Sequence, residues 1–224
     1  MSDTDLLENI EIETAPHPEI AIIWLHGLGA DGNDFVPIVR ELDLAGLPGI
    51  RFVFPHAKTM PVTINGGYVM RSWYDILGTE LTRREDEGGL RSSQLAVEAL
   101  IAREKSRGIP ASRIILAGFS QGCAMTLQTG LRHPERLAGM MCLSGYLPLA
   151  GQVAAERSEP SLQVPVFMAH GTQDPVVPFA RAEESRKVLE TLGYQVEWHA
   201  YPMQHTLCLE EVQDIAKWIR KVVG

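Results

Sequence analysis

The sequence contains few cysteines, few basic residues and no long apolar run. Its three cysteines, Cys123, Cys142 and Cys208, lie far apart, which excludes a disulfide framework and a CxxC site for metal or redox chemistry. We expect them to stay reduced and to pack as small apolar side chains. No stretch reaches the roughly 18 consecutive apolar residues of a membrane helix, and the first residues are acidic where a signal peptide is basic. The chain is therefore expected to be cytoplasmic, with no insertion into a membrane.

Basic residues are outnumbered by acidic ones. Lysine and arginine total 20 against 28 aspartate and glutamate residues, which gives a net charge of -8. Such a surface repels phosphate backbones and anionic lipid, so nucleic acid is not an expected partner. The sequence also lacks an HExxH segment, a cluster of histidine and cysteine, and a P-loop, so we expect neither a metal nor a cofactor. A weak homodimer is left open.

The remaining composition is typical of a folded globular protein. Of the 224 residues, 45% are hydrophobic and 21% are charged, and a chain of this length buries roughly 70% of its surface on folding. We expect a single domain that spans residues 1–224. Apolar runs rich in Ile and Val alternate with amphipathic segments, which predicts a mostly parallel sheet with helices on both faces. The predicted strands are Ile20–Leu25, Arg51–Phe54, Arg113–Ala117, Leu137–Leu143, Val164–Ala169 and Gln195–Trp198, with an edge strand around Ile10 and Ile12.

Helices are predicted between these strands, and glycines mark where several of them end. They are Asp34–Leu44, Ser93–Arg107, Phe179–Leu192 and a last helix with Val212, Ile215, Ala216 and Ile219 on its apolar face. The stretch Pro55–Gly89 follows neither period but carries much apolar mass, including Tyr68, Met70, Trp73 and Leu77. We expect it to be a long ordered excursion that either packs over a groove or belongs to the core.

A first glycine motif, Gly27–Gly32, follows a predicted strand and matches GxGxxG. This context is also that of a dinucleotide-binding turn, so a nicotinamide-dependent oxidoreductase is one alternative. That fingerprint needs an acidic residue at the end of the second strand, and Phe54–Lys58 has none. Asp31 lies inside the motif and would repel a pyrophosphate. The residues therefore favour another use of this loop.

A second glycine motif, Gly118–Gly122, reads GFSQG and lies between a predicted strand and a helix that begins at Gln121. A serine on such a sharp elbow crowds the positions two before and two after it, which is why both are glycine. The turn presents Ser120 above the sheet and directs the Gln121 N–H toward a developing oxyanion. The alternative is a serine that merely begins a helix.

An acid and a base follow Ser120 in the order that a nucleophilic elbow requires. Asp174 and His205 each lie in a loop after a predicted strand, 54 and 31 residues further along in turn. Because the carboxyl ends of parallel strands share one edge of a sheet, we expect the three side chains to converge. The Leu28 N–H can then turn toward the same oxyanion.

Other residues compete for these roles. His199 is the main rival as base, but it lies within or at the end of a strand, whereas His205 has a loop. His26 and His170 each precede a glycine and are expected to brace loops. Asp75 and Asp214 are alternative acids that we interpret as structural.

Four segments together resemble the bacterial carboxylesterase and acyl-protein thioesterase family. They are Leu25–Gly32 (LHGLGADG), Ser72–Ile76 (SWYDI), Gly118–Gly122 (GFSQG) and His170–Asp174 (HGTQD). The resemblance spans about Ile20 to Trp218 and implies an α/β-hydrolase fold without a separate cap domain.

The same resemblance implies roles for individual residues. Ser120, Asp174 and His205 would be the catalytic triad, and the N–H groups of Leu28 and Gln121 the oxyanion hole. Trp73 and Leu77 would line an acyl groove, to which we add Val176 and Val177 because they follow the acid. The family usually has glycine before the catalytic histidine, where this chain has Gln204. This departure affects the expected substrate range more than the mechanism.

The function predicted from the sequence is hydrolysis of carboxylic esters by a serine enzyme through an acyl-serine intermediate. Short to medium acyl chains are expected, with thioesters included, and the substrate is a small molecule or an acylated ester. A nicotinamide-binding oxidoreductase and a non-catalytic hydrolase-like binding protein remain as alternatives. Turnover of a p-nitrophenyl ester distinguishes an esterase from a non-catalytic binding protein.

Overall fold

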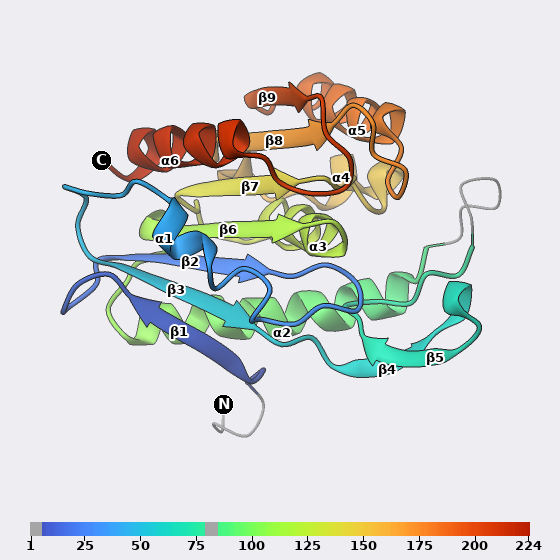
Figure 1. Ribbon diagram of the computed structural model, residues 1–224, viewed down its shortest axis with the longest axis horizontal. Helices are drawn as coiled ribbons and strands as arrows, with labels where there is room; N and C mark the ends of the chain where they lie inside the picture. Colours follow the sequence, from blue (N-terminus) through green and yellow to red (C-terminus); the bar gives the residue numbers. More distant parts are fainter. Residues whose placement is uncertain (1–5, 79–84) are drawn as a thin grey trace.

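The computed structural model describes residues 6–78 and 85–224, and its centre is a seven-stranded sheet (Figure 1). The strand order is β1-β3-β2-β6-β7-β8-β9. All neighbouring strands run parallel except β1, which pairs antiparallel with β3 at one edge. The strands are β1 Asn9–Glu13, β2 Ile20–Leu25, β3 Ile50–Pro55, β6 Ile114–Phe119, β7 Gly139–Leu143, β8 Val166–Gly171 and β9 Val196–Tyr201. The mostly parallel sheet and the edge strand at Ile10 and Ile12 are as predicted, and the structure shows in addition that this edge strand is antiparallel.

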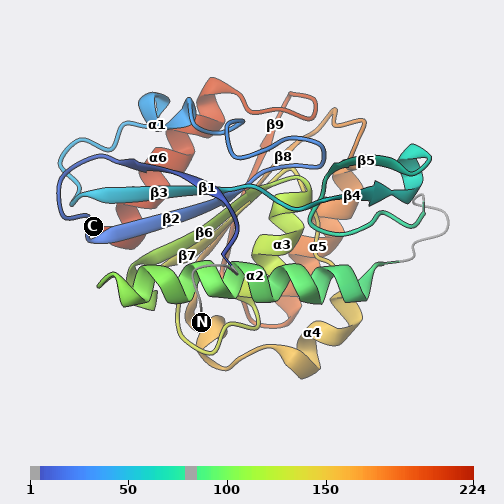
Figure 2. The same cartoon turned by 90° about the horizontal axis from the view of Figure 1, so that it is seen from below.

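Helices cover both faces of this sheet (Figure 2). One face carries α1 (Ile38–Glu41) and α6 (Leu209–Val223). The other carries α2 (Glu87–Ser106), α3 (Gln121–Gly130), α4 (Ala150–Glu156) and α5 (Phe179–Thr191). Among the described residues, short 3-10 helices occupy Thr63–Asn65, Ala111–Arg113 and Pro160–Gln163. In the part of the chain that the structure describes, we find no helix with the length and apolar character needed to span a bilayer.

Strand β2 shows why the core has two halves. Its side chains alternate between the faces: Ile20, Ile22 and Trp24 join the core under α1 and α6, and the residues between them join the core under α2 and α3. All six residues are fully buried because both faces are covered. The continuous apolar run of this strand is the consequence, and its predicted bounds match the observed ones.

Two helices begin or end elsewhere than the sequence predicts. The segment Asp34–Leu44 forms only the short α1. The residues before it form successive turns, in which the Asp34 N–H donates to the Asp31 carbonyl at 3.1 Å and the Val36 N–H to the Asn33 carbonyl at 3.2 Å. Helix α2 begins at Glu87, six residues before Ser93. Asp86 caps it by accepting the N–H of Gly89 at 2.9 Å, so a pair of glycines that resembles a turn lies inside the first helical turn.

The excursion Pro55–Gly89 contains regular structure that its sequence pattern does not reveal. A hairpin of β4 (Thr59–Val62) and β5 (Tyr68–Arg71) lies near the end of the sheet toward which the parallel strands point (Figures 1 and 2). Residues 79–84 of the excursion lie outside the described residues. The described part of this stretch contains a hairpin and a 3-10 helix, and it borders the edge of the sheet where the predicted site lies.

Candidate active site

Ser120 occupies a strained turn between β6 and α3. Its φ of 56° and ψ of -117° lie outside the regions that a side chain favours, at a cost of about 1–3 kcal/mol. A Cβ on Gly118 would lie 2.1 Å from the carbonyl oxygen of Gly122, and one on Gly122 would lie 2.2 Å from that of Leu25. Both glycines are therefore required by close backbone approach, for the steric reason inferred from the motif.

Asp174 and His205 lie together at the carboxyl ends of β8 and β9, which pair in register. His205 Nδ1 lies 2.6 Å from Asp174 Oδ2, so this nitrogen carries the proton and donates it to the carboxylate. The other oxygen, Oδ1, accepts the N–H groups of Val176 at 2.8 Å and Val177 at 2.9 Å. The carboxylate is fully buried, and these three donors hold it in one orientation.

The loop that carries His205 rests on the adjoining strand. A Cβ on Gly171 would lie 2.3 Å from the carbonyl oxygen of Met203 and 2.4 Å from that of Gln204. Gln204 itself is exposed, whereas the His205 ring is half-buried. A residue other than glycine before the histidine therefore fits here because it lies on the surface.

Phe119, the residue that precedes Ser120, contacts the ring of His205. The centroids of the Phe119 and His205 rings lie 4.7 Å apart. Within the described residues no hydrogen bond joins the Ser120 hydroxyl to His205. The structure thus joins acid to base directly and brings the base beside the residue that precedes the serine.

Two backbone N–H groups beside Ser120 have no hydrogen-bond partner in the described part of the chain, those of Leu28 and Gln121. The loop of Leu28 lies against the elbow, since a Cβ on Gly27 would contact Ser120 Cβ at 3.4 Å. The next N–H, that of Gly29, donates to the Arg71 carbonyl of β5 at 2.9 Å. The hairpin therefore holds the Leu28 loop, and α3 directs its positive end to the same point.

The side chain of Gln121 has a role that sequence reasoning missed. Its Oε1 accepts the N–H of Trp73 at 2.9 Å, and its Nε2 donates to the carbonyl oxygen of Tyr74 at 2.7 Å and to the Ser72 hydroxyl at 3.0 Å. The amide is buried, so it ties the excursion to the first residue of α3. The available signal was a long polar side chain at the first position of a helix that is buried along its whole length.

His26 braces the Leu28 loop, as expected. Its Nδ1 lies 2.7 Å from the Gly27 carbonyl oxygen, and its Nε2 accepts the Ala57 N–H at 3.0 Å. Burial, opposed by the hydrogen bond to Gly27, lowers the pKa of His26 to about 4. The ring is therefore neutral at physiological pH, and it acts as a hydrogen-bonded link between two loops.

The rival acids and base have other partners. His199 lies within β9 and contacts the carboxylates of Glu197 at 3.3 Å and Asp214 at 3.6 Å. Asp75 accepts the N–H of Thr63 at 2.7 Å within the excursion. None of these contacts involves Ser120 or its neighbours, and they support a structural interpretation of all three rivals.

The predicted groove residues differ in exposure. Trp73 is only 3% exposed, and its Nε1 donates to the His26 carbonyl oxygen at 2.9 Å. Val177 is buried, Leu77 is half-buried and Val176 is 63% exposed. Trp73 also borders a cavity of about 250 Å³, whose other lining residues are Leu7, Lys58, Thr59, Met60, Ser72, Gly89, Ser92, Ser93 and Ala96.

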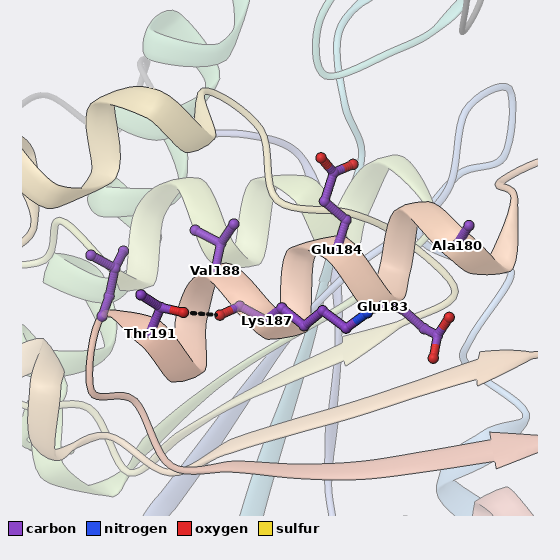
Figure 3. A pocket seen from close by; sticks show the side chains of 7 residues that line it. Ala180, Glu183, Glu184, Lys187, Val188 and Thr191 are labelled. Atoms are coloured by element: carbon purple, nitrogen blue, oxygen red, sulfur yellow. Dashed lines mark hydrogen bonds between the residues drawn. The ribbon is translucent and has the colours of Figure 1, made fainter.

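A larger hollow of about 420 Å³ runs along α5 and is unrelated to these residues (Figure 3). Its lining comes from one helix: Ala180, Glu183, Glu184, Lys187, Val188, Thr191 and Leu192. The Thr191 hydroxyl donates a hydrogen bond to the Lys187 carbonyl oxygen, as the dashed line shows. This hollow contains no nucleophile beside a base. Across residues 6–78 and 85–224, no three His, Cys, Asp or Glu side chains are grouped so that they could hold a metal ion.

The model of one protein family, described as phospholipase/carboxylesterase, matches residues 7–223. The chain belongs to this family. Acyl-protein thioesterase 1 of Neurospora crassa is 40% identical over 207 residues, which cover 88% of this chain and 84% of that protein. Acyl-protein thioesterase 1 of Yarrowia lipolytica is 37% identical over 205 residues, which cover 89% of this chain and 90% of that protein.

Solved structures give the same result for the fold of this phospholipase/carboxylesterase family member. Arabidopsis thaliana SOBER1 superimposes with a TM-score of 0.87 at 31% identity, over 92% of this chain and 99% of that one. Zea mays acyl-protein thioesterase 2 superimposes with a TM-score of 0.83 at 26% identity, over 96% and 99%. The predicted α/β-hydrolase fold is confirmed, and the protein is a serine hydrolase that acts on carboxylic esters. The family therefore favours the hydrolase over the nicotinamide-binding alternative.

Proposed function

We propose that Ser120, His205 and Asp174 form the catalytic triad of this esterase and that hydrolysis passes through an acyl-Ser120 intermediate. The observation that carries the proposal is the 2.6 Å contact between His205 Nδ1 and Asp174 Oδ2 beside the strained elbow of Ser120. A carboxylate held by three N–H groups keeps the Nδ1 proton on the imidazole, which leaves Nε2 free to act as a base.

The reaction follows from these positions. His205 Nε2 takes the Ser120 proton as Oγ attacks the carbonyl carbon of the ester. The tetrahedral oxyanion collapses, the bond to the leaving oxygen breaks, and His205 returns the proton to that oxygen. Water then attacks the acyl-serine with the same base, and Ser120 leaves with the proton.

We assign the oxyanion hole to the N–H groups of Leu28 and Gln121. Their lack of partners within the described residues supports this assignment, because such donors next to the nucleophile can bind a developing charge without reorganising. The hydrogen bond from the Gly29 N–H to β5 fixes the loop of Leu28, and the hydrogen bonds of the Gln121 side chain to the excursion fix the start of α3.

The proposed substrates are esters and thioesters of short to medium acyl chains. Thioesters are included because relatives at 37–40% identity are named acyl-protein thioesterases. We assign acyl contacts to Trp73, Leu77 and Val177. The exposed Val176 beside the acid is consistent with an apolar approach to the site.

We also propose that the enzyme works in the cytoplasm, without nucleic acid, and forms at most a weak homodimer. All three cysteines are free, as expected in a reducing compartment, and the net charge of -8 disfavours a phosphate backbone. Light scattering over a range of protein concentrations tests the homodimer.

The decisive test of the triad combines labelling with substitution. A fluorophosphonate should label the wild-type protein on one peptide, the one containing Ser120. Ser120→Ala and His205→Ala should each lower kcat on a simple p-nitrophenyl ester by about four orders of magnitude or more, because triad members act as a unit. His199→Ala is the matched control and should keep its activity. Labelling elsewhere, or retained turnover with a native circular dichroism spectrum, would refute the assignment.

The acyl contacts are tested by varying chain length. Each added methylene that becomes buried contributes about 0.8 kcal/mol, or roughly fourfold in kcat/KM, until the groove is filled. We expect an optimum between about four and ten carbons for p-nitrophenyl esters. The reason is that no cap domain is predicted, so no separate domain would cover a longer acyl chain. Trp73→Ala and Leu77→Ala should change this profile. If acetate is the best substrate and neither variant alters the profile, the groove does not exist as proposed.

A further inference from the structure

A second histidine contacts the acid of the proposed triad. His170 ends β8, its side chain is fully buried, and its Nε2 lies 3.3 Å from Asp174 Oδ2. The same nitrogen lies 2.8 Å from the carbonyl oxygen of Val177. Oδ2 therefore has an imidazole nitrogen on two sides, the nearer one being that of His205.

The neighbours of His170 define where its proton lies. Nε2 carries a proton, because it donates a hydrogen bond to the carbonyl oxygen of Val177 at 2.8 Å; Asp174 Oδ2, at 3.3 Å, is a close polar contact but not a second hydrogen bond. The opposite nitrogen, Nδ1, is buried and has no hydrogen-bond partner in the part of the chain that the structure describes. Burial also lowers the pKa of His170, which keeps the ring neutral. His170 is thus a fixed N–H donor near a buried negative charge.

We propose that His170 is a positioning residue for the triad, which orients the Asp174 carboxylate toward His205 and ties it to the loop of Val177. Val177 is held at both of its backbone groups: its N–H donates to Asp174 Oδ1 at 2.9 Å, and its carbonyl accepts from His170. The loop and the carboxylate therefore form one rigid unit around this ring. The inference rests on the proposed function, since His170 acts through Asp174 and touches no reacting atom.

Removing the donor should change the orientation of the carboxylate and the degree to which its negative charge is stabilised. Without the Nε2–H dipole 3.3 Å from Oδ2, the negative charge on Asp174 is less well stabilised by its surroundings and attracts a protonated His205 more strongly. The base is then harder to deprotonate. The loss of this dipole, together with the loss of the hydrogen bond that holds the Val177 carbonyl, should lower kcat by about tenfold or more, with KM changed by less than about twofold.

Two substitutions separate the hydrogen bond from the bulk of the ring. In His170→Gln, the amide nitrogen reaches about as far as Nε2 and can donate to the Val177 carbonyl oxygen while lying near Oδ2, so kcat should stay within about threefold of wild type. In His170→Leu, no donor remains, so kcat should fall and the acid limb of the kcat/KM profile should move to higher pH. If the leucine variant does not fold, His170→Asn replaces it, because its shorter amide cannot reach the Val177 carbonyl oxygen or approach Asp174 Oδ2.

A double-mutant cycle tests whether the effect passes through the carboxylate. In an Asp174→Asn background, His170→Leu should cause no further loss beyond about twofold, because the group it positions is gone. His133→Leu is the matched control, since His133 is another buried histidine, paired with Glu98, and should leave kcat unchanged.

An NMR titration of the His205 ring in Ser120→Ala protein needs no turnover and completes the test. The midpoint should be the same with histidine or glutamine at position 170 and higher with leucine. If the three proteins titrate alike, or if the loss in kcat persists in the Asp174→Asn background, the inference is wrong. If the midpoint moves but the wild-type protein hydrolyses no ester, His170 still positions Asp174 and it is the proposed function that fails.

Discussion

Glu211 is expected to make this protein less stable as the pH rises from 5 to 8. It lies in the first turn of α6, its side chain is fully buried, and neither carboxyl oxygen has a hydrogen-bond partner of good geometry among the described residues. Burial, only partly opposed by the Cys208 N–H, raises the pKa of Glu211 from 4.5 to about 8. In the folded protein the group is therefore neutral at pH 7, whereas in the unfolded chain it is ionised.

The sign and size of the effect follow from this difference. Between pH 4.5 and about 8 the folded state holds one proton more than the unfolded state, so the free energy of unfolding falls as pH rises. Each pH unit costs about 1.36 kcal/mol, which amounts to roughly 3 kcal/mol between pH 5 and 8. For a chain of this length that corresponds to about 6–12 °C in Tm. At pH below 4.5 the penalty disappears.

Glu211→Gln removes the titrating group and should remove this slope. Urea unfolding at pH 5, 6, 7 and 8 measures the free energy of unfolding of wild type and variant, and the difference between them should grow by roughly 3 kcal/mol over the range in favour of the variant. Glu210→Gln is the control, because the neighbouring Glu210 is exposed. A difference between Glu211→Gln and wild type that stays constant from pH 5 to 8 would refute the reasoning.

Three further predictions concern the elbow, its anchor and the cysteines. Gly118→Ala should abolish ester turnover or soluble expression, because its Cβ would lie 2.1 Å from the Gly122 carbonyl oxygen; activity within tenfold of wild type would contradict this. Gln121→Leu should cost about 2–4 kcal/mol in urea unfolding, because it leaves the Trp73 N–H and Tyr74 carbonyl without their partners, and a loss below about 0.5 kcal/mol would show that the anchor is unimportant. Since all three cysteines are free, dithiothreitol should change neither Tm nor kcat.

The alternation of strands and helices can be predicted from the pattern of apolar residues along the chain. Strand β2 is apolar at every position because helices cover both faces of the sheet, and this local property is visible in Ile20–Leu25 without any knowledge of the neighbours. The order Ser120, Asp174, His205 was also visible, since each residue follows an apolar run. Parallel strands bring their carboxyl ends to one edge, so the proximity of Asp174 to His205 follows from topology.

Which side chains support these groups depends on how distant segments pack together. Gln121 binds Trp73 across 48 residues, and His170 reaches Asp174 through a turn whose shape no periodicity encodes. Glu211 resembles any acidic residue near the start of a helix until packing removes it from water. Such roles depend on distances between segments far apart in the chain and on desolvation by their neighbours, and neither quantity is a property of a local pattern of residues.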